Sequence, residues 1–222
     1  SNGTLSGKLF GDRAPGSFEM SRTVKRPSSL GAQAPQGAVV LFDGRSIDAW
    51  QPTKMPWAIV DGGAMEVRAG NIASKQEFGD CKIHIEFRTP LIPAARGQSR
   101  GNSGVYVQGR YEIQILDSFG LEARDNECGG IYKKATPKQN ACLPPTEWQT
   151  YDITFSAPKF SNNGEKVKNA IITVELNGAL IHDKFELDSC CPGGLSDKEV
   201  KTGPLMLPDH NSKVQFRNIW VQ

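Results

Sequence analysis

Apolar and polar residues alternate with a period of two along much of this chain, which is the pattern of half-buried β-strands. In the stretch YEIQIL, the apolar residues Tyr111, Ile113 and Ile115 alternate with Glu112 and Gln114. The stretch therefore predicts a strand with one apolar face and one face that carries a carboxylate and an amide. This polar pair makes the strand the first candidate for a functional site.

The segment NSGVYVQ before this strand alternates in the same way, and Gly109 and Arg110 between the two segments predict a tight hairpin turn. In such a hairpin Glu112 and Gln114 lie close to polar side chains of the first strand. Carboxylates, amides and aromatic rings together are typical of a small-molecule site, and of a sugar site in particular. The neighbours, which depend on the strand register, are Tyr106 and Gln108 or Asn102.

The pattern alone leaves two interpretations of this polar face open. One face of an antiparallel sheet commonly meets water, and the alternation then needs no other explanation. Water-facing strand positions usually carry Lys, Thr, Ser or Arg, however, whereas this face consists of Asn, Gln, Glu and Tyr. The strand also ends in Asp117, which a Ser-Phe-Gly turn follows. These two features favour a functional face.

Similar alternation elsewhere predicts about a dozen short strands, separated by turns such as Asp61-Gly-Gly and Asn177-Gly. Residues 81–88 are typical of a regular half-buried strand, with His84 and Glu86 on its polar face. No stretch predicts a long helix, and no repeat of fixed period is present. The sequence therefore predicts an all-β fold, a two-sheet antiparallel sandwich or jelly roll.

The chain divides into an arm and one domain. Residues 1–37 are rich in Gly, Pro, Ser and Arg and predict an extended arm that lies over a single β-domain of residues 38–222. Within the domain, residues 121–147 form a long irregular stretch that contains Gly-Gly-Ile-Tyr and Pro-Pro. Loops of this length inside a compact domain are usually functional or cover a ligand.

Composition and charge exclude several classes of protein. The 222 residues include 23 Gly and 14 Pro, which suits many short strands and turns. No apolar stretch approaches the ~18 residues of a membrane span. The net charge of +2 arises from scattered basic residues, which argues against a nucleic-acid partner. No signal peptide is visible, and we expect an exported protein, periplasmic or extracellular, whose leader is not part of this sequence.

The five cysteines form no CxxC pair, so a zinc ribbon is not expected. Cys128 and Cys142 flank a loop-rich segment and are spaced to close it as a disulfide, which would suit an exported protein. Reduced thiols packed in a core are the equal alternative. No cofactor is expected. A metal-dependent site stays open because Asp, Glu and His occur near the candidate site, but no ligand spacing compels a metal.

Six stretches follow one another from about Val39 to the C-terminus as a series of motifs. They are LFDGRSIDAW (41–50), RGNSGVYVQGRYEIQILDSFG (100–120), CGGIYKKATP (128–137), EWQTYDI (147–153), VELNGALIHD (174–183) and GPLMLPDHNSKVQFRNIWV (203–221). Together they resemble the 3-keto-disaccharide hydrolase family, which belongs to the concanavalin A-like lectin and glucanase superfamily.

The resemblance implies a β-jelly-roll with its site on the concave sheet. The NSGVY motif of the family falls on residues 102–106, its YE-Q-LD motif on residues 111–117, and its DH-FRNI ending on residues 209–219. One position departs from the pattern, because Pro208 stands where the family usually has Gln before the Asp-His pair. The departure removes an amide from the site or its border and leaves substrate preference and activity open.

The resemblance also implies 3-keto sugars as substrates, in which the carbonyl acidifies the hydrogen at C2. Proton abstraction at C2, loss of the glycosidic oxygen from C1 and later addition of water cleave such a sugar. We predict Glu112 or His210 as the base, with Asp117 or the other of that pair as the acid. The predicted substrate-binding residues, some of which stabilise the oxyanion, are Asn102, Tyr106, Gln108, Gln114, Trp148 and Arg217.

An ordinary two-carboxylate glycoside hydrolase is an alternative. The spacing Glu112-x-Gln114-x-x-Asp117 is similar to the Glu-x-Asp-x-x-Glu signature of laminarinase-type retaining glucanases, whose two carboxylates lie ~5 Å apart. In a regular strand Glu112 and Asp117 point to opposite faces, so this function requires a strand bulge.

A carbohydrate-binding module without catalysis is the third interpretation. Trp50, Trp57, Trp148 and Trp220 are candidate stacking platforms, although strand tryptophans more often lie in a core. All three interpretations share an oligosaccharide or glycoside as the partner. The oligomeric state stays open.

Overall fold

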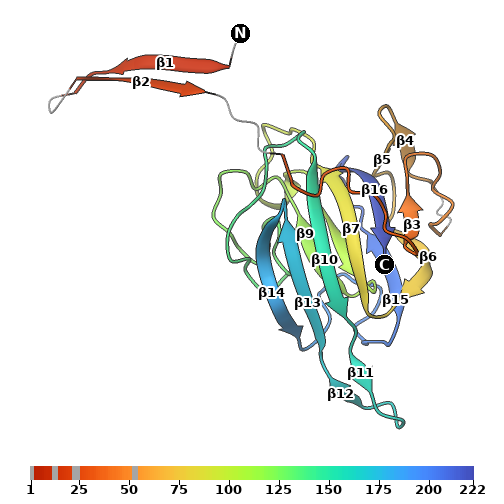
Figure 1. The fold of residues 1–222 in the computed structure, drawn as a ribbon. Coiled ribbons are helices and arrows are strands. Elements are labelled where there is room, and N and C mark those ends of the chain that lie inside the picture. Colours follow the sequence, from red (N-terminus) through yellow and green to blue (C-terminus); the bar gives the residue numbers. More distant parts are fainter. Residues whose placement is uncertain (1–2, 12–14, 22–25, 52–54) are drawn as a thin grey trace.

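The protein is a sandwich of antiparallel sheets (Figure 1). One sheet has eight strands and the other has four. The structure is a computed structural model that describes residues 3–11, 15–21, 26–51 and 55–222. Apart from a single 3-10 turn, η1 (Gly97–Ser99), the described residues contain no helix. The predicted all-β sandwich is confirmed.

The larger sheet joins segments that lie far apart in the sequence. The predicted Asn177-Gly178 turn connects two of its strands with φ values of 55° and 78°, the left-handed pair that a two-residue hairpin turn requires. In spatial order the strands are β14 (Ala179–Leu187), β13 (Ala170–Leu176), β10 (Gln149–Ser156), β7 (Cys81–Arg88), β16 (Gln215–Val221), β5 (Ala64–Glu66) and β4 (Ala58–Val60), with β3 (Val39–Phe42) also paired to β16.

The smaller sheet contains the predicted central hairpin. Its spatial order is β6 (Ile72–Phe78), β15 (Gly203–Leu207), β8 (Ser103–Val107) and β9 (Tyr111–Ile115). The predicted two-residue turn between β8 and β9 is corrected to a longer one. Strand pairing ends at Val107 and Tyr111, and Gln108 already has left-handed backbone geometry at φ 54°. Gln108 therefore belongs to the turn and leaves the alternation of β8.

The core lies between the two sheets and is built from the apolar sides of their strands. Val105, Ile113 and Ile115 are fully buried there. The Tyr111 ring lies 5.5 Å from the ring of Phe155 on the opposite sheet. Because Val105, Ile113 and Ile115 point inward, the alternating polar residues of β8 and β9 point out of the sandwich.

Two small hairpins extend beyond the sandwich (Figure 1). One consists of β11 (Lys159–Phe160) and β12 (Lys166–Lys168). The other, β1 (Thr4–Leu9) with β2 (Gly16–Ser21), lies in the N-terminal arm, which the sequence predicts as an extended segment.

Part of the arm, from Ser29 to Ala32, crosses the outer face of the larger sheet. Ser29 Oγ donates to Asp152 at 2.5 Å, and Gly31 N donates to Glu86 at 2.6 Å. The Ala32 carbonyl accepts from Asn218 Nδ2 at 3.0 Å. This segment therefore binds β10, β7 and β16 together from outside.

The covered face contains a buried charge cluster where the sequence predicted a half-buried strand. His84 and Glu86 are fully buried. Burial alone lowers the pKa of His84, but hydrogen bonds to Asp152 and Glu86 outweigh burial and raise it to about 9. Burial alone raises the pKa of Glu86, whereas hydrogen bonds from His84, Asn218 and Gly31 lower it to about 2. The cluster is thus an imidazolium ion held between carboxylates.

All five cysteines are free thiols, so the structure does not contain the disulfide that the sequence allowed between Cys128 and Cys142. Both residues are nevertheless buried, as the alternative of core thiols predicts. Cys128 Sγ lies 3.4 Å from the Tyr151 hydroxyl. Among the described residues, no helix has the length and apolar character needed to cross a membrane.

Candidate active site

The polar face of the β8–β9 hairpin is the floor of a cavity. The strand register places Tyr106 opposite Glu112 and Gly104 opposite Gln114, and opposed residues of an antiparallel pair lie on the same face. The cavity has a volume of about 410 Å³, and segments distant in sequence form its walls. Its lining residues are Gln98, Asn102, Tyr106, Glu112, Gln114, Tyr132, Pro192, Gly193, Asp209, His210 and Asn211.

Two glycines leave the space that the buried polar pair occupies. A Cβ atom at Gly104 would lie 2.4 Å from Glu112 Oε1, and one at Gly193 would lie 2.8 Å from the Tyr106 hydroxyl. Both distances are shorter than real side chains show. A larger residue at Gly104 or Gly193 would therefore require Glu112 or Tyr106 to shift from the position described here.

Glu112 is a carboxyl group in an environment that disfavours its charge. The side chain is 1% exposed, and Oε1 has no hydrogen-bond partner among the described residues. Burial raises the pKa of Glu112 to about 7, although the hydrogen bond from Tyr106 acts in the opposite direction. A proton on this carboxyl group is thus available near neutral pH.

The Pro192 carbonyl competes with Glu112 for the single hydrogen of the Tyr106 hydroxyl. It lies 2.8 Å from Glu112 Oε2 and 2.8 Å from the Pro192 carbonyl oxygen. A hydroxyl has one hydrogen and cannot donate to both. When Glu112 is protonated, its O–H donates to Tyr106 and Tyr106 donates to Pro192. When Glu112 is ionised, Tyr106 donates to the carboxylate and the Pro192 carbonyl loses its donor.

His210 is the second titratable group that faces the cavity with a free atom. Its Nδ1 lies 3.0 Å from Asn102 Oδ1, while its Nε2 has no hydrogen-bond partner in the described part of the chain. Burial lowers the pKa of His210, and the nearby Asp209 carboxylate opposes this effect. The imidazole is therefore neutral at pH 7, with a lone pair available on the unpartnered ring nitrogen.

Asp209 anchors the loop that carries His210. Its two carboxylate oxygens accept backbone N–H bonds from Gly70 at 2.9 Å and Asn211 at 2.8 Å. Its own N–H donates to Asn71 Oδ1 at 2.9 Å. Both oxygens of the Asp209 carboxylate therefore serve to attach the His210 loop to the chain just before β6.

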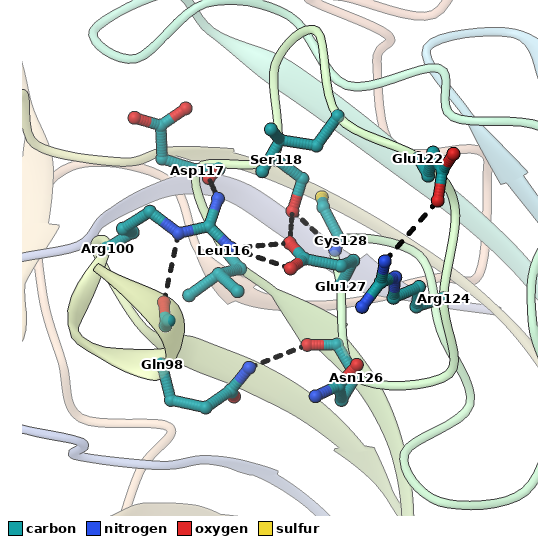
Figure 2. Close-up of polar contacts among 12 residues, drawn as sticks. Gln98, Arg100, Leu116, Asp117, Ser118, Glu122, Arg124, Asn126, Glu127 and Cys128 are labelled. Carbon is teal, nitrogen blue, oxygen red and sulfur yellow. Dashed lines mark hydrogen bonds and ion pairs between the residues drawn. The ribbon is translucent and has the colours of Figure 1, made fainter. Parts of the chain in front are cut away.

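Five of the predicted site residues line this cavity: Asn102, Tyr106, Glu112, Gln114 and His210. The other four predicted residues lie elsewhere. Gln108 Nε2 donates to the carbonyls of Phe78 and Lys201, because the longer turn removes it from the polar face of β8. Asp117 follows the end of β9, and its carboxylate points away from the neighbouring Arg100–Glu127 pair (Figure 2).

Arg217, in β16, and Trp148, the residue before β10, lie on the side of the larger sheet away from the cavity. Arg217 Nε donates to Glu86 at 2.6 Å. The Trp148 ring lies under two guanidinium groups, at 4.0 Å from Arg217 and 4.7 Å from Arg88. Alternation alone could not show which sheet these strands join. Both side chains stabilise the outer face instead of binding in the cavity.

The remaining tryptophans are core or covered residues. Trp50 and Trp57 are buried, and their indole N–H groups donate to the carbonyls of Leu41 and Gly70. Trp220 stacks on His84 under the N-terminal arm, with ring centroids 5.1 Å apart. None of them lines the cavity between the described loops.

Several lining residues were not among the predicted site residues: Gln98, Tyr132, Pro192, Gly193, Asp209 and Asn211. The sequence signal for Tyr132 was the long loop after β9. Its N–H donates to the Glu112 carbonyl at 2.9 Å, which attaches the loop to the edge of the sheet. Within the described ranges, no group of three or more His, Cys, Asp or Glu side chains is arranged to hold a metal ion.

Comparison with known proteins decides the family. Residues 37–222 match the 3-keto-disaccharide hydrolase family, whose domain is described as 3-keto-alpha-glucoside-1,2-lyase-like. The chain belongs to this family. The resemblance seen in the sequence motifs is therefore confirmed, and the family match covers the sandwich and its cavity. Among curated proteins, none matches the chain.

Solved structures agree with this family assignment. A protein of Parabacteroides distasonis ATCC 8503, provisionally described as a glycosyl hydrolase, is 34% identical, with a TM-score of 0.79 over 92% of this chain and 93% of that one. Two further such proteins of the same organism are 18% and 21% identical, with TM-scores of 0.61 and 0.60. They cover 83% and 84% of this chain and 93% and 99% of their own. These two show the fold alone, whereas the family as a whole is carbohydrate-active and glycosidase-like.

The departure from the family pattern at Pro208 has a visible structural setting. The Pro208 carbonyl accepts a hydrogen bond from Ser103 Oγ at 2.9 Å, which fixes the start of the His210 loop against β8. Proline has no side-chain amide, so position 208 contributes no hydrogen-bonding side chain beside the cavity.

Proposed function

We propose that this protein cleaves the glycosidic bond of 3-keto-glycosides, with His210 as the base at C2 and Glu112 as the acid at the glycosidic oxygen. One observation carries the proposal: a single cavity holds a neutral imidazole with a free Nε2 and a carboxyl group whose pKa is raised to about 7. Paired titratable groups whose surroundings separate their roles are typical of acid–base catalysis. The description of the family supports a 3-keto-glucoside as the substrate class.

The proposed reaction has two stages. His210 Nε2 takes the C2 proton, whose acidity the 3-keto group provides, and the electron pair forms the C1–C2 double bond as the C1–O bond breaks. Glu112 delivers its proton to the departing glycosidic oxygen, which leaves as the alcohol. Water then adds across the C1–C2 double bond, so that C1 receives the hydroxyl group and C2 regains a hydrogen.

Several lining groups are suited to holding the sugar. Asn102 and Gln114 provide amides on the floor, and Tyr132 provides an aromatic ring on the wall. Glu112 Oε1 is buried without a partner, so a hydrogen-bonding group of the substrate gains most at this atom. We assign Asn102, Gln114 and Tyr132 to substrate binding. We assign to Tyr106 the role of positioning the Glu112 side chain.

The two-carboxylate alternative finds less support in the cavity. Asp117, its predicted second carboxylate, lies outside, and both oxygens of Asp209 already accept backbone N–H bonds. The binding-module alternative lacks tryptophan platforms among the lining residues. Elimination needs one carboxyl group and one imidazole, and Glu112 and His210 supply these from the described lining of the cavity.

The test is an assay in D2O with a chromogenic 3-keto-glycoside and, in parallel, with the ordinary glycoside. We expect aglycone release from the keto substrate alone, with deuterium at C2 of the product in excess of the exchange seen without enzyme. Glu112→Gln and His210→Gln should each lose ~10²-fold or more of the rate. Asp117→Asn, a matched loss of a carboxylate outside the cavity, should retain it.

Other outcomes would redirect the assignment. Release from the ordinary glycoside without deuterium at C2 would identify a two-carboxylate hydrolase. Sugar binding without release from either substrate would identify a binding module. Loss of activity in Asp117→Asn would show that the catalytic acid lies outside the cavity described here.

A further inference from the structure

Gln98 joins three segments of the cavity wall, although no motif pointed to it. It belongs to η1, and its half-buried side chain lines the cavity. Its Nε2 donates to the Asn126 carbonyl at 2.8 Å (Figure 2). Its Oε1 accepts from Gln114 Nε2 at 2.8 Å and from Asn102 Nδ2 at 3.5 Å. One amide thus connects a loop, the floor strand and the start of β8.

The orientation of the Gln98 amide is determined from two directions. The Asn126 carbonyl can only accept, so the amide nitrogen of Gln98 must face it. Independently, Gln114 Oε1 accepts the Ile115 N–H at 3.1 Å, which turns Gln114 Nε2 towards Gln98. Gln114 therefore requires an acceptor at Gln98. Both requirements place Oε1 of Gln98 on the side of the cavity floor.

The orientation of the Gln98 amide determines the orientation of the Asn102 amide, which in turn determines the tautomer of His210. Since Gln98 offers an acceptor, Asn102 turns its Nδ2 towards Gln98 and its Oδ1 towards His210 Nδ1, 3.0 Å away. An oxygen at that distance requires a hydrogen on Nδ1. The neutral ring then carries no hydrogen on Nε2, which is the atom without a protein partner.

An ion pair next to Gln98 joins the two chain segments that Gln98 and its partner Asn126 belong to. Arg100, two residues after Gln98, contacts both carboxylate oxygens of Glu127 at 2.7 and 2.8 Å, and Glu127 is adjacent to Asn126. Ser118 Oγ also donates to Glu127 at 2.5 Å. The two side chains of the ion pair are only 14% exposed. Figure 2 shows this ion pair next to the Gln98–Asn126 hydrogen bond. The pair therefore helps to hold Gln98 and Asn126 together.

We propose that Gln98 is a positioning residue that holds His210, through Asn102, in the tautomer with hydrogen on Nδ1 and a free lone pair on Nε2. Gln98 itself touches no reacting atom in this scheme. The role of Nε2 as a base rests on the proposed function, whereas the tautomer is a property of the protein alone. The two can therefore fail separately.

The test is long-range ¹H–¹⁵N NMR of the histidine rings, recorded at a pH well above the pKa of an ordinary histidine. The protein has three histidines, and two serve as internal controls. His84 is fixed by Asp152 at 2.7 Å and His182 by the Gly129 carbonyl at 2.8 Å, both away from Gln98. We expect His210 to show a protonated Nδ1 and an unprotonated Nε2.

Gln98→Met keeps the length of the side chain and removes its amide, so Asn102 loses the acceptor that orients it. We expect the two His210 tautomers to become mixed while His84 and His182 keep their signals. In the double variant Gln98→Met with Asn102→Asp, a carboxylate presents only acceptors to Nδ1 and should restore the original tautomer. The rate on the keto-glycoside should fall about tenfold in Gln98→Met.

An unchanged His210 tautomer in Gln98→Met would overturn the proposal, as would failure of the double variant to restore it. If all three histidines change, Gln98 supports the fold in general and the proposal is equally rejected. If the tautomers respond as expected but the wild type releases no aglycone from keto-glycosides, the proposed function fails and the positioning role stands.

Discussion

Replacing Glu112 with glutamine removes a buried proton-binding group and leaves most of its surroundings intact. The glutamine amide can donate to the Tyr106 hydroxyl as the protonated carboxyl does, and Tyr106 can still donate to Pro192. The variant therefore imitates the acid form of Glu112 at every pH. Comparison with the wild type isolates the free energy of ionising this one carboxyl group in the folded protein.

The magnitude follows from the pKa of about 7 in the folded protein and an ordinary value of 4.5. The folded state binds this proton more tightly than the unfolded state, so the contribution is fully present below pH 4.5 and is lost as the pH rises through 7. A difference of about 2.5 pKa units corresponds to about 3 kcal/mol. The wild type should lose this much stability across the window relative to Glu112→Gln.

The assay is urea denaturation of both proteins at a series of pH values, and the quantity of interest is the difference between their free energies of unfolding. All other titrating groups cancel in this difference. Asp117→Asn is the matched control for the loss of a carboxylate, because its carboxylate lies outside the cavity. A difference between wild type and Glu112→Gln that stays constant between pH 4.5 and pH 8 would refute a raised pKa at Glu112.

Two further substitutions test other parts of the structure. Gly104→Ala brings a Cβ atom to 2.4 Å from Glu112 Oε1, so we expect loss of glycosidase activity with a folded circular dichroism spectrum; full activity would contradict the described floor. His84→Gln removes the imidazolium ion between Asp152 and Glu86 and should cost about 3 kcal/mol of stability, measured by denaturation. Because the pKa of His84 is raised to about 9, this cost should be full below pH 6.5 and should fade as the pH rises through 9. A cost that does not depend on pH would mean that His84 is neutral.

The hairpin that forms the cavity floor could be predicted from sequence because its alternation follows directly from burial. The buried Ile113 and Ile115 force Glu112 and Gln114 to the opposite face, whatever surrounds the strand. The turn was less predictable, since pairing stops one residue before the alternation of apolar and polar residues does. That single residue removed Gln108 from the site.

The walls of the cavity could not be predicted, because they depend on contacts between loops that are distant in sequence. Gln98 contacts Asn126 across 28 positions of the sequence, and Tyr106 contacts Pro192 across 86. Whether a polar strand face is exposed to solvent could not be predicted from the sequence either. His84 looked half-exposed in the pattern of its strand, whereas in the structure it is fully buried, stacked on Trp220 and hydrogen-bonded to Asp152.

The arm also changes where this protein can be cut. The family match begins at residue 37, yet Ser29, Gly31 and Ala32 supply bonding partners to three strands of the larger sheet. A chain shortened to the family boundary would expose Asp152, Glu86 and Trp220 to solvent on that face. We therefore expect that a fragment must extend about ten residues before the family domain to keep the native sheet. The reason is that these residues supply hydrogen-bond partners to buried polar groups. Anyone who engineers this scaffold should treat the segment from Ser28 onward as part of the sandwich.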